Sequence, residues 1–147
     1  KIFLTASALE QLLGCAPLLA ARGIDPEEAG ALTALLQRAG FRWGLDGADR
    51  GDDGTHSLSW AIDRLVLAVM ADFLPSGVGN ALGANAGGNS LDNTIRYMNF
   101  VPTEWVLADI RIHAVHAGFA HGRVHLFAQD GTLLATASQS LIVRIHS

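Results

Sequence analysis

The sequence predicts an α+β fold in which an antiparallel β-sheet is wrapped around a long central helix, with a helical N-terminal segment before it. Two observations carry this prediction. Residues 57–73 are apolar on nearly every side of a helix, a pattern typical of a helix that is covered all round. From Ser90 onward, apolar and polar residues alternate, as they do in β-strands with one buried face. Because only a surrounding structure can bury a helix completely, we expect the sheet to curl around it.

Composition and charge narrow the class of protein. The chain has 147 residues, 50% of them hydrophobic, which suits one folded domain, and we assign residues 1–147 to a single domain. Ten basic and 14 acidic residues give a net charge of −4. Nucleic-acid binders normally carry a basic surplus, so we expect no nucleic-acid partner. The apolar runs are far shorter than the roughly 20 residues of a membrane-spanning helix, and Cys15 is the only cysteine, so we expect a cytoplasmic protein without a membrane partner.

The first 45 residues are expected to form helices. Ser7 and Glu10 have the spacing of a capping box, in which a hydroxyl and a carboxylate satisfy free backbone N–H groups at the start of a helix. A further helix is predicted to begin with Asp25 as its cap and Pro26 at its first position, and to stop at Gly40. Together these signals define a helical segment over residues 1–45.

Antiparallel strands are expected over residues 88–146, after a loop of small residues at 76–89. The pair Asp130-Gly131 between two alternating runs is a strong signal for a β-hairpin, and the spacing of the runs predicts an antiparallel meander. Strict alternation in the first strand would place Ser90 and Thr94 on the same face.

Two polar residues in apolar surroundings are candidates for chemistry. Asp72 lies at the C-terminal end of the predicted central helix, where the helix dipole disfavours a carboxylate. It is either an exposed residue on a polar edge or a catalytic acid or base. Gln139 lies in the last strand among small and apolar residues. Its amide is able to hold a water or a substrate oxygen, although an outward-facing polar position explains it equally well.

The histidines give no clear metal signal. His121 and His125 are spaced to share one face of a strand, but no third ligand is evident, and we expect no metal site. The glycine-rich stretch at 77–83 follows a helix rather than a strand, so we interpret it as a connection and not as a phosphate loop.

Four stretches occur in the order and spacing of a known family. They are Asp63–Pro75, Asn89–Thr94, Glu104–Leu107 and Gln129–Gln139. On these stretches, residues 63–147 resemble the second half of acyl-CoA thioesterase II, the TesB-like hot-dog thioesterases. Where that family often has Asp-His-Ser, this chain has Asp92-Asn93-Thr94.

The resemblance implies a hot-dog fold and hydrolysis of an acyl-CoA thioester by an activated water, with no cofactor and no covalent intermediate. The family's catalytic roles fall on Asp72, Ser90 and Gln139, which would jointly hold and polarise the water. We assign Thr94 and Arg96 to substrate binding. Family members commonly fuse two hot-dog repeats, and this chain has room for one. Because a lone sheet would expose an unpaired edge, we expect a homodimer or pairing with a second hot-dog unit.

Two other functions remain open. The first is a non-catalytic hot-dog module that binds acyl groups or serves in assembly, and it would be favoured if Gln139 pointed to solvent. The second is a hot-dog hydratase or dehydratase, which requires His56 to lie within reach of an acid.

Overall fold

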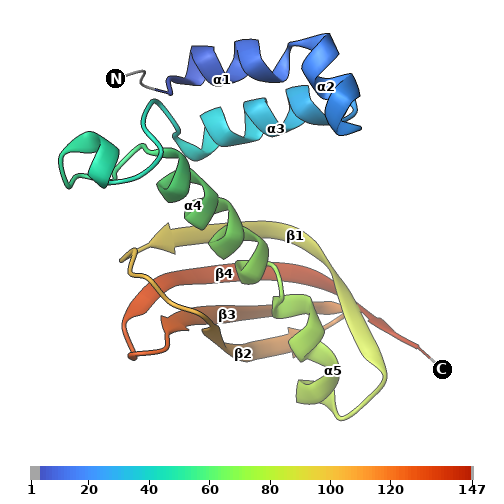
Figure 1. Cartoon of the computed structure of the whole chain (residues 1–147). Helices are drawn as coiled ribbons and strands as arrows, with labels where there is room; N and C mark the ends of the chain where they lie inside the picture. Colours follow the sequence, from blue (N-terminus) through green and yellow to red (C-terminus); the bar gives the residue numbers. More distant parts are fainter. Residues whose placement is uncertain (1–3, 147) are drawn as a thin grey trace. The chain divides into compact units, whose positions relative to one another are not determined.

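The computed structural model describes residues 4–146, which form two compact units, the first ending at Leu65 and the second beginning at Val66. Helices α1 to α3 belong to the first unit, and all four strands belong to the second (Figure 1). The boundary falls inside helix α4, which the sequence analysis treated as the centre of one domain. Each unit is therefore described by itself.

The first unit is built from helices, as expected for the N-terminal segment. Its elements are α1 (Ala6–Leu13), α2 (Ala16–Arg22), α3 (Pro26–Ala39) and the short 3-10 helix η1 (Ala48–Arg50). Helices α1 and α3 pack against each other over a small apolar core. The buried residues of this core are Leu9, Leu36, Ala39, Phe41 and Ala61.

Helix α3 begins and ends where the sequence predicts. The Asp25 carboxylate accepts the backbone N–H groups of Glu27 at 2.7 Å and Glu28 at 3.2 Å, and Pro26 occupies the first turn. At the other end, Gly40 adopts the left-handed conformation with φ of 106°. Both signals depend only on a few adjacent residues, so they can be recognised in the sequence without knowledge of the fold.

The predicted cap of α1 is wrong by two residues. The side chain of Thr5, rather than Ser7, accepts the backbone N–H of Ala8, at 3.0 Å. Thr5 also forms an antiparallel bridge with Trp43, which holds it in the extended conformation that an N-cap requires. This distant backbone contact decides between two hydroxyl residues that are locally equivalent.

Replacing Asp25 with alanine is expected to destabilise the first unit by about 1 kcal/mol, because two backbone donors lose their acceptor. Urea unfolding followed by helical circular dichroism measures the change. The Asp25→Asn variant keeps an acceptor oxygen and should stay close to the wild type. An equal loss in both variants would contradict a capping role.

Helix α4 (Leu58–Ala71) nearly coincides with the predicted central helix and is followed by the 3-10 turn η2 (Leu74–Ser76) and by α5 (Gly77–Leu82). The prediction of an unbroken loop over 76–89 is therefore wrong. The side chain of Val78 is fully buried in the core of the second unit, so packing offsets the low helix propensity of the glycines around it.

The sheet of the second unit contains β1 (Ala86–Tyr97), β2 (Val106–His116), β3 (Phe119–Ala128) and β4 (Leu133–Ile145). All neighbours are antiparallel, in the order β1-β4-β3-β2. The meander holds for the last three strands, and it fails for β1, which pairs with β4 instead of β2. No tight turn joins β1 to β2, so nothing local forces those two strands to pair.

The hairpin between β3 and β4 forms at the predicted residues. Gly131 has a φ of 87°, and the Asp130 carboxylate accepts the backbone N–H of Thr132 at 2.9 Å. This hydrogen bond lowers the pKa of Asp130 below its ordinary value, because it favours the charged form.

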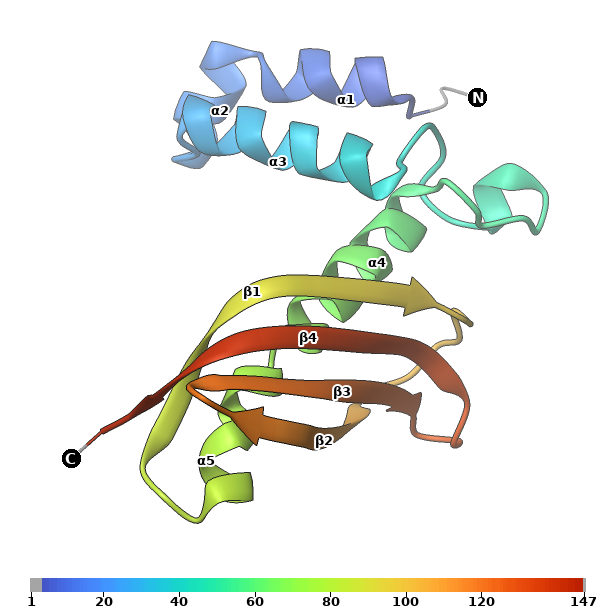
Figure 2. The same ribbon diagram turned by 180° about the vertical axis from the view of Figure 1, so that it is seen from behind.

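Within the second unit, the end of α4, η2 and α5 lie on one face of the sheet, as the two opposite views in Figure 1 and Figure 2 show. The core between them is aliphatic. Its buried residues on the helical side are Leu67, Ala71, Leu74 and Val78, and on the sheet they include Val124, Leu126, Ala137 and Leu141. An antiparallel sheet packed on a helix in this way is a hot-dog fold of the α+β class, as the sequence predicted.

The expectation that α4 is buried on all sides is wrong. Val66, Val69 and Phe73 expose 49%, 66% and 55% of their surface. The sheet of this chain covers only the opposite side of the helix, so the remaining apolar stripe has no cover among the described residues. By length and composition alone the segment Leu58–Leu82 would also suffice to cross a membrane, a criterion that core helices of soluble proteins meet as well.

Candidate functional site

Asp72, Ser90 and Gln139 meet on the helix-facing side of the sheet, in the second unit. The Gln139 amide Nε2 donates to Asp72 Oδ1 at 2.5 Å and to Ser90 Oγ at 2.7 Å. The Ser90 hydroxyl in turn donates to the backbone carbonyl of Asp92 at 3.1 Å. The three side chains predicted to converge are thus joined directly, while their catalytic roles stay a prediction.

Each of these side chains is positioned by a different element. Asp72 follows the last residue of α4, and its backbone N–H still bonds to the carbonyl of Val69 at 3.1 Å. Ser90 and Gln139 lie on the neighbouring strands β1 and β4. The Gln139 side chain is fully buried, so the outward-facing interpretation of this residue does not apply.

A β-bulge in β1 determines which residues share the site. The pairing of β1 with β4 shifts between Ser90 and Asp92, which leaves Leu91 as the additional residue. A bulge interrupts the two-residue alternation, so Asn93, rather than Asp92, comes opposite Gln139. The predicted common face of Ser90 and Thr94 is therefore wrong.

Asn93 is a site residue that the sequence reasoning missed. Its amide Nδ2 donates to Asp72 Oδ1 at 3.3 Å, so this oxygen receives two amide N–H groups. The signal that pointed to it was the departure from the family's Asp-His-Ser pattern, which falls on this residue. Strict alternation had placed it on the wrong face.

The predicted substrate-binding residues Thr94 and Arg96 do not join this site. They pair with Ser138 and Thr136 and lie on the other face of the sheet from Gln139. The same bulge explains the error, because it reverses the face of every residue that follows it in β1.

The site presents acceptor oxygens. Both hydrogen bonds to the Asp72 carboxylate end on Oδ1. The Gln139 Oε1 atom is buried and has no hydrogen-bond partner among the described residues. A buried acceptor normally has a donor, and a water molecule is small enough to fit beside the site and has two O–H groups to donate to two acceptors at once. The arrangement is suited to orienting a water molecule beside a carboxylate.

His56 has a structural position in the first unit. Its Nδ1 lies 2.8 Å from the carbonyl oxygen of Gly40, and its ring packs edge-on against Trp60 with centroids 5.0 Å apart. No hydrogen bond joins it to a carboxylate within residues 4–146. Hydrogen bonds from Thr55 lower the pKa of Asp53, and His56 contributes to this shift, so an acid lies near His56 and the hydratase or dehydratase stays an alternative prediction.

Metal ligation finds no support in residues 4–146, where no group of three His, Cys, Asp or Glu side chains is placed to hold an ion. His121 and His125 do share a face of β3, as expected, but the His121 ring contacts the Ser140 hydroxyl at 3.2 Å.

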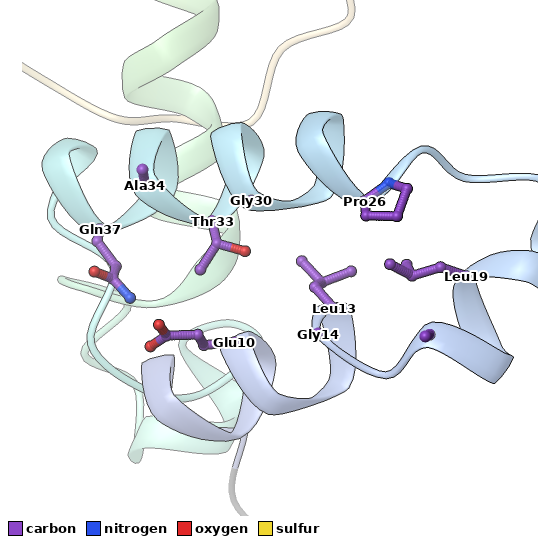
Figure 3. Close-up of a pocket in the computed structure, with 10 residues that line it drawn as sticks. Glu10, Leu13, Gly14, Leu19, Pro26, Gly30, Thr33, Ala34 and Gln37 are labelled. Carbon is purple, nitrogen blue, oxygen red and sulfur yellow. The ribbon is translucent and has the colours of Figure 1, made fainter.

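The first unit contains a hollow of about 280 Å³ between its helices. Leu13, Leu19 and Pro26 line one end, and the polar side chains of Glu10 and Gln37 lie at the other (Figure 3). It brings together no pair of groups suited to acid–base or nucleophilic chemistry, so the candidate site is the cluster around Gln139.

Comparisons with solved structures return proteins most of which are described as thioesterases, and no curated protein matches. A proposed thioesterase from Novosphingobium aromaticivorans shares 47% identity and a TM-score of 0.49, over 52% of this chain and 30% of that one. The BH2602 protein from Bacillus halodurans, solved with CoA, has 15% identity and a TM-score of 0.49, over 54% and 56% of the two chains. Acyl-CoA thioesterase II TesB2 from Mycobacterium marinum has 21% identity and a TM-score of 0.39, over 60% and 34%. The chain thus spans between about a third and somewhat more than half of these proteins.

The family comparison gives a different result from the resemblance found in the sequence. Residues 3–102 match the family described as the RecBCD enzyme subunit RecC fourth domain. The match includes the helices of both units and β1, whereas β2, β3 and β4 follow it. Through residues 3–102 the chain belongs to the family of the fourth domain of RecC, and its second unit has the hot-dog fold.

Proposed function

We propose that the second unit is part of an acyl-CoA thioesterase of the TesB-like type, which hydrolyses a thioester with a water held by Asp72, Ser90 and Gln139. The observation that carries this proposal is the fully buried Gln139 amide, which bonds to both Asp72 and Ser90 and keeps an acceptor oxygen free of other partners. The four sequence stretches that resemble this family support it.

The chemistry follows from the positions of the oxygens. A water that donates to Gln139 Oε1 and to the free oxygen of Asp72 has its lone pair directed away from both. Asp72 takes a proton as the water oxygen attacks the thioester carbonyl carbon. The carbon–sulfur bond then breaks, and the thiolate of CoA receives the proton. No cofactor and no covalent enzyme intermediate enters this sequence.

We further propose that the site is completed by a second hot-dog unit, either another copy of this chain or a separate one. Strands β1 and β2 are both edges of the sheet, and the apolar stripe of Val66 and Val69 on α4, continued by Phe73 just after it, is exposed. Unpaired edges and apolar stripes of this kind are normally covered in the active form of a protein.

An assembly module is the second candidate. The observation in its favour is the match of residues 3–102 to a domain of an enzyme subunit, which is a component of a larger assembly by its description. In that case the second unit would bind partners without hydrolysing thioesters.

The two candidates are separated by thiol release from a panel of short-chain, long-chain and aromatic acyl-CoAs. We expect hydrolysis by the wild type and a loss of about 10²-fold in kcat for Gln139→Leu, because the substitution removes the groups that orient the water. Thr136→Val, on the same strand as Gln139 and the opposite face, is the matched control and should leave the rate unchanged. If the wild type binds an acyl-CoA without releasing thiol, the second unit is a non-catalytic acyl-binding module, and if it neither binds nor hydrolyses any acyl-CoA of the panel, the assembly module is favoured.

A further inference from the structure

Figure 2 shows the outer face of the sheet, which is turned away from α5. By the strand register, this face carries a set of polar side chains that the proposed reaction does not use. Strand β1 contributes Asp92, Thr94 and Arg96, β4 contributes Thr136, Ser138 and Ser140, β3 contributes His121, Arg123 and His125, and β2 contributes Asp109 and Arg111. Arg96, Arg111, Arg123 and, nearer the end of β4, Arg144 thus lie on one face of a chain whose net charge is −4.

Strand pairing aligns four of these residues in one row across the sheet. Thr94 is opposite Ser138, Ser138 is opposite Arg123, and Arg123 is opposite Arg111. Like charges at directly opposed positions destabilise a sheet unless an anion separates them. The pairing of Arg111 with Arg123 therefore favours a negative group between or above them.

The acidic residues of the outer face do not supply that negative group to Arg123. Asp109 binds Arg111, with its Oδ2 3.2 Å from the Arg111 Nε. Asp92 accepts the backbone N–H of Ser140 at 2.8 Å. Arg123 has no ion pair within residues 4–146, and its buried Nε has no hydrogen-bond partner there.

Hydroxyl groups complete the surroundings of Arg123. Ser138 lies on the next strand, and Thr94 lies one strand further, so the row spans about 10 Å from Thr94 to Arg123 at the usual strand spacing of about 4.8 Å. Arg96, two residues after Thr94 on the same strand, adds a further positive charge to the outer face. Guanidinium forks combined with hydroxyl donors are the groups that bind the oxygens of a phosphate.

We propose that the outer face binds a phosphate or diphosphate group above Ser138, held by Arg123, Arg111 and the hydroxyls of Ser138 and Thr94. This site is separate from the cluster around Gln139, because the two lie on opposite faces of the sheet, and it does not depend on thioesterase activity. The phosphate chemistry has two possible sources, a free phosphate or diphosphate and the phosphate groups of CoA.

The test is a titration of the full chain with inorganic pyrophosphate and, separately, with CoA, followed by backbone amide NMR at low ionic strength. We expect saturable shifts at Thr94, Arg123 and Ser138. Arg123→Gln should weaken pyrophosphate binding by about tenfold or more, since a charge-assisted hydrogen bond is lost. Arg144→Gln is the matched control, because Arg144 lies on β4 beyond the row, and it should stay within about twofold of the wild type.

Each outcome decides the proposal. Shifts with both ligands that depend on Arg123 support it and include CoA as a source, whereas shifts with pyrophosphate alone support it and exclude CoA. Shifts with CoA alone would show that the contacts are not made to phosphate, and they would overturn it. An equal loss in Arg144→Gln, or no shift at the row in the folded wild type, would also overturn it.

Discussion

Replacing Asp72 with asparagine is expected to lower the rate of acyl-CoA hydrolysis by about 10³-fold, which is within the range that general-base groups contribute. Asparagine keeps the shape of the side chain, and its amide is unable to take a proton from water. Asparagine also keeps the oxygen that accepts the amide N–H groups of Gln139 and Asn93, so the structure of the site should be preserved. The loss should therefore fall on kcat, with little change in KM. Thiol release at saturating and limiting substrate separates the two.

Asp92→Asn is the matched control for this experiment. Asp92 is close to Ser90 in sequence, but its carboxylate bonds to the backbone of Ser140 on the other face of the sheet. An asparagine keeps that acceptor, so the rate should remain near the wild type. If Asp72→Asn hydrolyses acyl-CoA as fast as Asp92→Asn, Asp72 has no part in the mechanism. The assignment of the hot-dog fold would not change.

Replacing Gly122 with alanine is expected to destabilise the second unit by about 3 kcal/mol, at the upper end of the usual cost of overpacking. A Cβ at this position would lie 2.5 Å from the backbone oxygen of Arg111, 3.1 Å from a methyl of Leu74 and 3.2 Å from a methyl of Ile112. The glycine therefore allows η2 to pack closely on β3. The midpoint of chemical unfolding, followed by tryptophan fluorescence and far-UV circular dichroism, measures the effect.

Gly30→Ala provides the opposite result as a control. Gly30 lies inside α3, and a Cβ there would meet nothing within 4 Å. Alanine should raise the stability of the first unit by about 0.5–1 kcal/mol, because it reduces the backbone entropy of the unfolded chain. A wild-type midpoint for Gly122→Ala would show that the sheet relaxes around the added methyl group.

The predictable parts of the fold are those encoded by local chemistry. Asp25 and Gly40 bound α3 as predicted, and the Asp130-Gly131 pair forms the hairpin, because caps and tight turns depend on the conformations of a few adjacent residues. The errors all involve distant contacts. Trp43 selects Thr5 as the cap of α1, and burial of Val78 creates a helix in a glycine-rich stretch.

The same division applies to the candidate site. The resemblance to a known family identified Asp72, Ser90 and Gln139, which the structure joins by hydrogen bonds. The separate assignment of Thr94 and Arg96 to substrate binding is not supported by the structure, which places both on the other face of the sheet. Periodicity assumes an uninterrupted ladder, and no composition signal marks the position at which a strand contains one additional residue.

The additional residue in β1 has an evolutionary consequence. Straightening β1 so that Leu91 pairs with Ser140 would exchange the two surfaces of the remaining strand: Asp92 would come opposite Gln139 and Asn93 would leave that side. Removing Leu91 altogether would leave the present register intact, because Asp92, Asn93 and Thr94 would keep their partners in an uninterrupted ladder. Related sequences that keep the chemistry should therefore keep an amide at position 93 opposite Gln139, whether or not they keep the additional residue.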